Sequence, residues 1–296
     1  MQGTTLIRFD WAIKKLLRRK ANFKVLEGFL SVLLKDNIVI EQILESESNQ
    51  EDMNDKFNRV DIIAENSKKE IIIIEVQVNG EADYFQRMLY GTSKILTEHI
   101  HLGDDYNKLR KVYSVNIVYF DLGQGKDYVY HGKTDFIGIH NNDKLNLSNR
   151  QKEVFNISEL SGIFPEYYVI KVNQFDDIAK DSLDEWIYYL KNNDVKSEYD
   201  APGLEIVKEN LRVEKLNIQD KFIYNRHIEN IRLEKSVMFT ARDEGKVEGI
   251  MIGKIEGKIE GKTDVAILMI NDGESNDKIR KYTGLDEDKI NELRKQ

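Results

Sequence analysis

VDIIAE (residues 60–65) and EIIIIEVQV (residues 70–78) decide the fold. The second stretch carries four consecutive isoleucines, a β-branched run that is typical of a strand buried on both faces. A short polar connection, Ser67 to Lys69, joins the two stretches. We therefore predict an antiparallel hairpin, with strands over residues 57–65 and 70–78.

The register of this hairpin decides whether its acidic residues meet. Strand side chains alternate, so Glu75 and Gln77 share one face and Val76 points to the other. With a three-residue loop at 67–69, Asp61 lies directly opposite Glu75, with Cβ atoms about 4.5–5.5 Å apart. A two-residue loop would move Asp61 to the wrong face.

Two opposed carboxylates repel each other, so this register needs a cation. Mg²⁺ is commonly held by one or two carboxylates and keeps several waters. Such an ion activates a water and stabilises the charge on a phosphodiester under attack. The residues alone also allow a simpler interpretation, in which Asp61 ends its strand near solvent and Glu75 makes a salt bridge.

The composition excludes several other classes of protein. The chain has 296 residues, a formal net charge of -8 and no cysteine. Disulfide frameworks, thiolate zinc sites and cysteine nucleophiles are therefore excluded. No apolar run approaches the roughly 20 residues of a membrane helix, and no signal peptide is evident. We expect a cytoplasmic protein without a membrane partner.

The acidic total hides a basic N-terminal segment. Residues 1–35 carry eight Lys and Arg against two acidic residues, a balance of 8 − 2 = +6, whereas residues 41–55 are acidic. Lys14, Lys15, Arg18 and Arg19 are candidate contacts to DNA phosphates. The alternative is a solvated helix face.

The remaining pattern alternates helices and strands before a helical C-terminal half. Helices are expected over residues 8–35, with a break near 21–22, and over 81–100, and from 181 onward, with Asp181 or Ser182 as an N-cap. Further strands are expected over residues 38–44, 111–122, 127–140 and 167–175. This order indicates an α/β or α+β core.

Four residues on the predicted helices are further candidates. Arg87, Tyr90 and Lys94 share one face of the 81–100 helix, directly after the hairpin, and are predicted to contact phosphate. The alternative for Arg87 is an i,i+4 pair with Asp83. Glu27 interrupts the apolar face of the first helical segment and needs a partner.

Several ordered motifs resemble one nuclease family. Besides VDIIA and IIIIEVQ, they are FDWAIKKLL near the start, YFQRMLYGTSKIL, GDDYNKL and the C-terminal Glu-Gly repeats. The chain resembles the PD-(D/E)XK nucleases, and more closely the Rpn-type recombination-promoting nucleases and putative transposases. The resemblance implies a restriction-endonuclease-like α/β core, a mixed sheet flanked by helices, with a helical C-terminal extension.

The resemblance also implies an activity and its residues. Asp61 and Glu75 would be metal ligands, together with the main-chain carbonyl of Val76, and Glu27 would match a helix-one acid beside the metal. Gln77 stands where the motif has Lys and can only orient a water by hydrogen bonds. The implied function is a Mg²⁺- or Mn²⁺-dependent endonuclease that hydrolyses double-stranded DNA through a metal-activated water.

The implied biological role is mobile-element recombination or phage defence. Val60 replaces the Pro of the motif. The replacement of Lys by Gln77 motivates an alternative, a catalytically inactive nuclease fold that binds DNA or a protein. Asp10 belongs to the resembling segment, but its position before the first helical turn favours an N-cap role.

The C-terminal region contains a glycine repeated every fourth residue, from Gly245 to Gly261. Each interior glycine costs about 1 kcal/mol of helix stability relative to Ala. We therefore expect this helix to fold against a partner, which could be a second copy of the chain; the alternative is a flexible linker. The expected parts are a nuclease-like domain (1–180), a helical extension (181–243), a Gly-repeat helix (244–262) and a small helical cap (263–296).

Overall fold

The computed structural model describes residues 6–44, 61–100 and 104–295, in two compact units that comprise residues 1–221 and 222–296. Residues 181–221, part of the expected helical extension, belong to the first of these units. Helices α5 (Ser182–Asn192) and α6 (Leu204–Asn210) pack against α2 (Phe23–Leu34) within the first unit. The expected strand start at residues 57–60 and most of the acidic 41–55 stretch lie outside the described residues.

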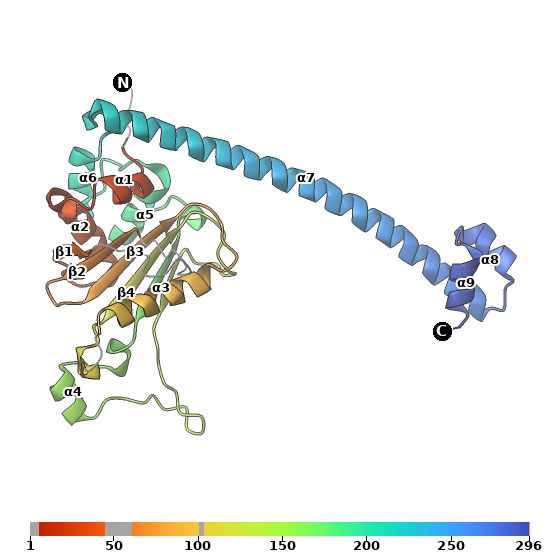
Figure 1. Cartoon of the computed structure of the whole chain (residues 1–296), viewed down its shortest axis with the longest axis horizontal. Helices are drawn as coiled ribbons and strands as arrows, with labels where there is room; N and C mark the ends of the chain where they lie inside the picture. The colour runs from red at the N-terminus through yellow and green to blue at the C-terminus, as the bar shows by residue number, and fades with distance from the viewer. Residues whose placement is uncertain (1–5, 45–60, 101–103, 296) are drawn as a thin grey trace. The chain divides into compact units, whose positions relative to one another are not determined.

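A six-stranded mixed sheet forms the centre of the first unit, in the order β1-β2-β3-β4-β6-β5 (Figure 1). The neighbours β3, β4 and β6 run parallel, and the pairs β1–β2, β2–β3 and β5–β6 are antiparallel. The strands are β1 (Ile40–Leu44), β2 (Ile62–Asn66), β3 (Ile71–Gln77), β4 (Val112–Val118), β5 (Val129–Gly132) and β6 (Glu166–Lys171). The predicted mixed α/β fold is confirmed.

The hairpin has the predicted register. Ile62 pairs with Ile74 and Glu65 with Ile71, which corresponds to the three-residue loop. The Asn66 side chain stabilises this turn, because its Oδ1 accepts hydrogen bonds from the backbone N–H groups of Lys68 (3.0 Å) and Glu70 (2.9 Å). The same register carries Asp61, directly before β2, to the level of Glu75.

Strand β3 is buried from Ile71 to Val76, as its isoleucine run predicts. Helix α3 (Tyr84–Glu98) packs against β4, and Tyr84 and Met88 of this helix contact Val118 and Val169 of the sheet. Phe9, Phe29, Trp186 and Tyr189 join helices α1, α2 and α5 through edge-on and tilted ring contacts. These contacts fix the N-terminal helices to the first unit.

The predicted N-terminal helix over residues 8–35 is interrupted earlier than expected. It consists of α1 (Phe9–Lys15), a short 3₁₀ turn at Lys20–Asn22 and α2. The expected N-cap role of Asp10 is wrong, because Arg8 occupies the cap position and Asp10 lies inside the first turn. Its buried carboxylate pairs with the Arg8 guanidinium at 3.0 Å. The predicted cap at Asp181 is confirmed, since its side chain accepts from the N–H groups of Leu183 and Asp184.

The remaining helices complete both units. A short helix α4 (Asn149–Phe155) precedes β6, and the 54-residue helix α7 (Ile218–Asn271) runs without interruption through the glycine repeat. Helices α8 (Asn276–Thr283) and α9 (Glu287–Leu293) pack with the end of α7 around Ala266, Ile279 and Ile290. None of the helices in the described parts of the chain is long and apolar enough to span a bilayer.

Candidate metal and nucleic-acid site

Asp61 is held at the start of β2 by both its backbone and its side chain. Its Oδ2 accepts a hydrogen bond from the backbone N–H of Val76 at 2.7 Å, which fixes the carboxylate beside β3. The Arg18 guanidinium donates to the Asp61 carbonyl, with Nε 3.1 Å away. Lys14 Nζ lies 3.5 Å from Asp61 Oδ1. The basic N-terminal segment is thus attached to the acid that the hairpin register singled out.

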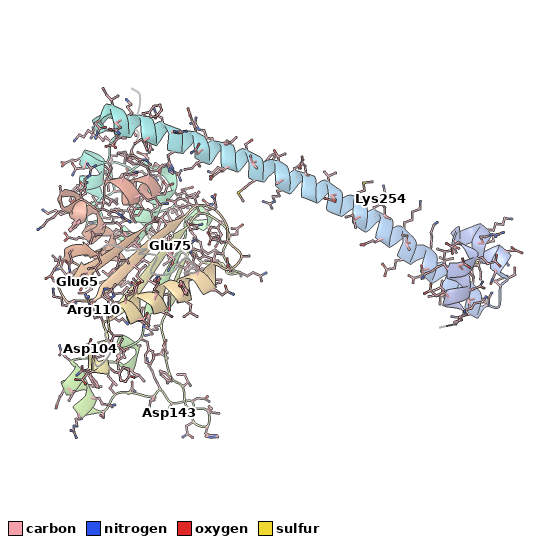
Figure 2. The ribbon with its side chains drawn as sticks, in the orientation of Figure 1. Glu65, Glu75, Asp104, Arg110, Asp143 and Lys254 are labelled. Carbon is pink, nitrogen blue, oxygen red and sulfur yellow. The ribbon has the colours of Figure 1, made fainter. Side chains whose placement is uncertain are left out.

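Glu75 lies in the middle of the sheet, on the face that α3 covers (Figure 2). Only 4% of its surface is exposed. Arg87 of α3 places Nη2 2.6 Å from Glu75 Oε1. Oε1 is therefore buried against a guanidinium, which supplies its countercharge.

Both carboxylates have raised pKa values, and the charge of Asp61 acts on Glu75. Burial raises the pKa of Glu75 to about 7; the negative charges of Asp61 and Glu81 add to the rise, and Arg87 opposes it. Burial also raises the pKa of Asp61 and outweighs Lys14, the Val76 N–H and Arg18, which lower it. Two close acids with raised pKa values mark a place where additional positive charge would be stabilising.

Glu81, an acid outside the predicted site residues, joins Gln77 and Arg87. Gln77 Nε2 donates to Glu81 Oε1 at 2.7 Å, and Arg87 Nη1 donates to both Glu81 oxygens at 2.9 and 3.0 Å. Glu81 follows Gly80 in the loop before α3, and its six-residue spacing from Arg87 matches no helical pattern. No periodic signal could therefore have identified it.

The residues present fit a hard divalent cation in part. Asp61 and Glu75 supply two carboxylates, which are the kind of oxygen ligand that such an ion binds, and Arg87 already pairs with Glu75 Oε1. Within residues 6–44, 61–100 and 104–295, no group of three or more acidic or histidine side chains could hold a metal. Additional ligands would be waters or a main-chain carbonyl, for which Val76 is the predicted candidate.

The other predicted DNA contacts lie on two elements beside this pair. Lys14, Lys15, Arg18 and Arg19 are all exposed, at the end of α1 and directly after it. Of these four, Lys14 and Arg18 approach Asp61. The basic face predicted for this segment therefore adjoins the acid pair.

On α3, Arg87 does not form the alternative side-chain pair with Asp83, because its guanidinium contacts Glu75 and Glu81 instead. Tyr90 and Lys94 follow on the same helix face, and Lys94 Nζ lies 3.9 Å from Glu98. The structure thus brings Arg87 into the acid pair and places Tyr90 and Lys94 further along α3.

Glu27 is not brought to this site. Its Oε1 accepts a hydrogen bond from the backbone N–H of Ile40 at 2.8 Å, at the first residue of β1. Ile40 pairs with Asn66, which is the end of β2 farthest from Asp61. At about 3.3 Å per strand residue, the five steps from Asp61 to Asn66 span roughly 16 Å. The predicted need of Glu27 for a partner is met by a backbone N–H.

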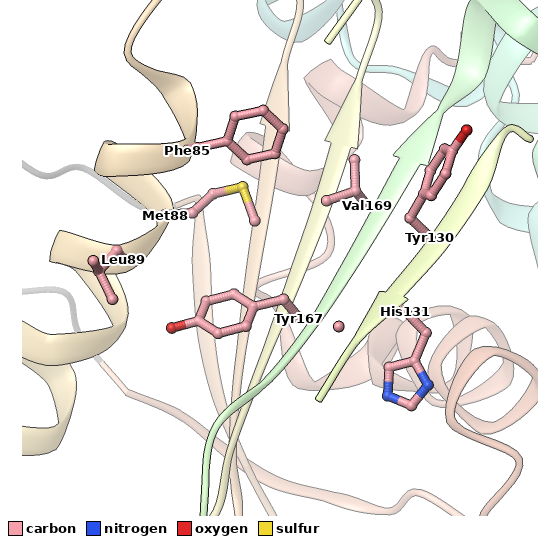
Figure 3. A pocket seen from close by; sticks show the side chains of 8 residues that line it. Phe85, Met88, Leu89, Tyr130, His131, Tyr167 and Val169 are labelled. Carbon is pink, nitrogen blue, oxygen red and sulfur yellow. The ribbon is translucent and has the colours of Figure 1, made fainter. Parts of the chain in front are cut away.

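An apolar pocket of about 400 Å³ lies between α3 and strands β5 and β6 (Figure 3). Its walls include Phe85, Met88 and Leu89 on the helix side and Tyr130, Tyr167 and Val169 on the sheet side. Phe85 and Leu89 are two residues from Arg87 in either direction, which places them on the opposite side of the helix. The pocket is therefore separate from the acid pair.

Comparison with known proteins identifies the class to which this fold and site belong. The chain matches the family described as PD-(D/E)XK nuclease family transposase over residues 7–239. This match covers most of the chain, so the protein belongs to that family, as the resemblance implied. No curated protein and no solved structure matches the chain.

Proposed function

We propose that this protein is a divalent-metal-dependent endonuclease that hydrolyses double-stranded DNA, with Mg²⁺ or Mn²⁺ as its ion. Its family supports a nuclease-type hydrolase. One observation carries the proposal to this chain: Asp61, directly before β2, lies at the level of Glu75 on β3, and its negative charge raises the energetic cost of ionising the buried Glu75. A bound cation would remove that cost.

In this proposal, one group of residues would bind the ion and another group would bind DNA. Asp61 and Glu75 would bind the cation with the Val76 carbonyl, and the ion when bound would activate a water and stabilise charge on the phosphodiester. Gln77 is held by Glu81 on the same face as Glu75, and orients a water by hydrogen bonds. Lys14, Lys15, Arg18 and Arg19 would contact phosphates.

The location and the biological role follow from the same proposal. We place the protein in the cytoplasm, acting on DNA in mobile-element recombination or phage defence, as its transposase family suggests. Fractionation of cells that produce the protein would check the location.

A second candidate is an inactive nuclease fold that binds DNA or a protein. The observation that favours it is that the acids already have cationic partners within the chain, because Arg87 pairs with Glu75 and Lys14 lies beside Asp61. In that case the basic segment would retain DNA while the acids make only structural ion pairs.

Plasmid nicking distinguishes the two candidates. Purified protein is incubated with supercoiled DNA in Mg²⁺, Mn²⁺ or EDTA, beside Asp61→Asn and Glu75→Gln. Asp83→Asn is the matched control, because Asp83 is an exposed acid whose side chain caps no backbone N–H. The endonuclease proposal expects nicking that requires metal, persists in Asp83→Asn and falls at least a hundred-fold in the other two variants. DNA retention without nicking in any metal would instead support the inactive fold.

A further inference from the structure

Helix α7 exposes a row of apolar side chains along its glycine repeat. Val247, Met251, Ile255 and Ile259 have exposed fractions of 62%, 64%, 51% and 53%. They recur every fourth residue, in step with the glycines. The described residues bury none of this row, for which a second copy of the chain was one expected partner and a flexible linker the alternative.

Each four-residue repeat places its residue types on different sides of the helix. At about 100° per residue, the order Gly-Lys-apolar-Glu puts Lys on one flank of the apolar row and Glu on the other. Lys254 and Lys258 precede Ile255 and Ile259, and Glu256 and Glu260 follow them. The glycines lie on the side away from the apolar row, not beside it.

This charge pattern selects one orientation of a two-fold pair. When two copies face each other in parallel, the two-fold axis brings the Lys flank of one helix against the Glu flank of the other. In an antiparallel pair the axis brings Lys against Lys and Glu against Glu. Opposite charges across such a seam set partner choice and orientation, so the repeat is self-complementary only in parallel.

The centre of the repeat departs from the pattern in a way that suits a crossing point. Ile250 and Ile252 replace the flanking charges on either side of Met251, and they are 62% and 47% exposed. A row that recurs every four residues follows the i±4n ridge, whose packing gives helix crossings near −50°. Contact between such helices concentrates at the crossing, where this chain is apolar on three adjacent positions.

We propose that α7 is a parallel self-association surface, through which two copies of this chain cross at Met251, flanked by Lys-to-Glu pairs between the copies. This proposal does not depend on nuclease activity. A short crossing buries less area than a long coiled coil, so association will depend on protein concentration.

Sedimentation of the full-length chain tests the surface. The mass is expected to rise from 34.6 kDa toward twice that value as concentration increases. Met251→Asp should keep the protein monomeric throughout that range. Leu233→Asp is the matched control, because Leu233 is an equally exposed apolar residue of α7 at 65% but lies outside the repeat. A wild-type chain that stays monomeric would overturn the proposal.

Single cysteines test the orientation, since the native chain has none. Val247→Cys and Ile255→Cys should each be captured as dimers by a short bis-maleimide when alone. If the pair were antiparallel and centred on Met251, the bis-maleimide would capture dimers only in a mixture of the two variants. Preferential capture of Gly249→Cys would show that the glycine side forms the contact and would refute the proposed surface.

Charge exchange tests complementarity. Replacing Lys254 and Lys258 by Glu makes both flanks acidic, and replacing Glu256 and Glu260 by Lys makes both basic. Each variant alone should lose dimer, and an equal mixture of the two should restore it. Self-association of either variant at wild-type strength would contradict the pairing of Lys with Glu.

Discussion

Glu75 and Asp61 are acids that the first unit keeps largely out of water and close to each other. The Asp61 carboxylate is fixed by the N–H of Val76, and Glu75 depends on Arg87 for its countercharge. Gln77 can supply no such charge, because an amide is neutral. The arrangement at the residue scale is therefore a carboxylate pair with three nearby cations, Lys14, Arg18 and Arg87, and a neutral amide on the same strand as Glu75.

The raised pKa of Glu75 predicts how pH and metal change stability. Its folded pKa of about 7 exceeds the unfolded value of 4.5, so the folded state holds the proton more tightly. The contribution of the Glu75 carboxyl to the free energy of unfolding is thus complete below pH 4.5 and is lost as pH rises through about 7. A bound divalent ion should offset that loss, because metal binding competes with the proton.

Thermal unfolding measures this linkage without any assay of activity. We expect Mg²⁺ or Mn²⁺ to raise the melting temperature more at pH 8 than at pH 5.5, relative to EDTA. Asp61→Asn should abolish the metal-dependent rise, and Asp83→Asn should preserve it. An equal rise in the Asp61 variant would mean that the ion binds elsewhere.

At the scale of elements, glycines in two helices differ in what an added Cβ atom would contact. Gly28 of α2 lies against the turn before α6, where an added Cβ would collide with the Pro202 carbonyl and lie 2.7 Å from the Gly203 Cα. Gly249 of α7 has nothing within 4 Å of such a Cβ. Close backbone approach explains one glycine and not the other.

Alanine substitution should separate these two cases. Gly28→Ala is expected to destabilise the first unit by about 1–3 kcal/mol, because backbone must move to admit the methyl group. Gly249→Ala should stabilise its helix by about 1 kcal/mol. Urea unfolding followed by circular dichroism gives both values, and a neutral Gly28→Ala would contradict the observed packing of α2.

At the scale of the whole molecule, each of the two units has a core of its own. The sheet and its helices enclose one, and Ala266, Ile279 and Ile290 form the other at the end of α7. No residue from 232 to 261 is buried. The exposed middle of α7 therefore contributes little to either core.

Truncation after Asp243 should consequently remove association and preserve the nuclease unit. The shortened chain is expected to retain the melting temperature of the first unit and its response to metal, while its mass becomes independent of concentration. Calorimetry and light scattering provide the two measurements. Loss of the folded sheet on truncation would show that the first unit requires the C-terminal residues.

Much of the local structure could be predicted because it depends on neighbours in sequence. Alternation of side chains and a three-residue loop fix the β2–β3 register, and hence the meeting of Asp61 with Glu75. The Asp181 cap follows from an equally local rule, whereas the glycine-repeat helix forms although each of its glycines disfavours a helix. The packing of α5 and α6 on α2 could not be predicted in this way, because it is a long-range contact.

The amino-acid sequence by itself determined the hairpin, the acid pair, the class of protein and the row of apolar residues on α7. Only the tertiary structure decided which cations accompany those acids. Lys14 of α1 lies beside Asp61. Arg87 pairs with Glu75 instead of Asp83. Glu27 accepts a hydrogen bond from the backbone N–H of Ile40. The physical reason is that strand and helix periods act over a few residues, whereas the partner of a buried charge is set by how distant elements pack.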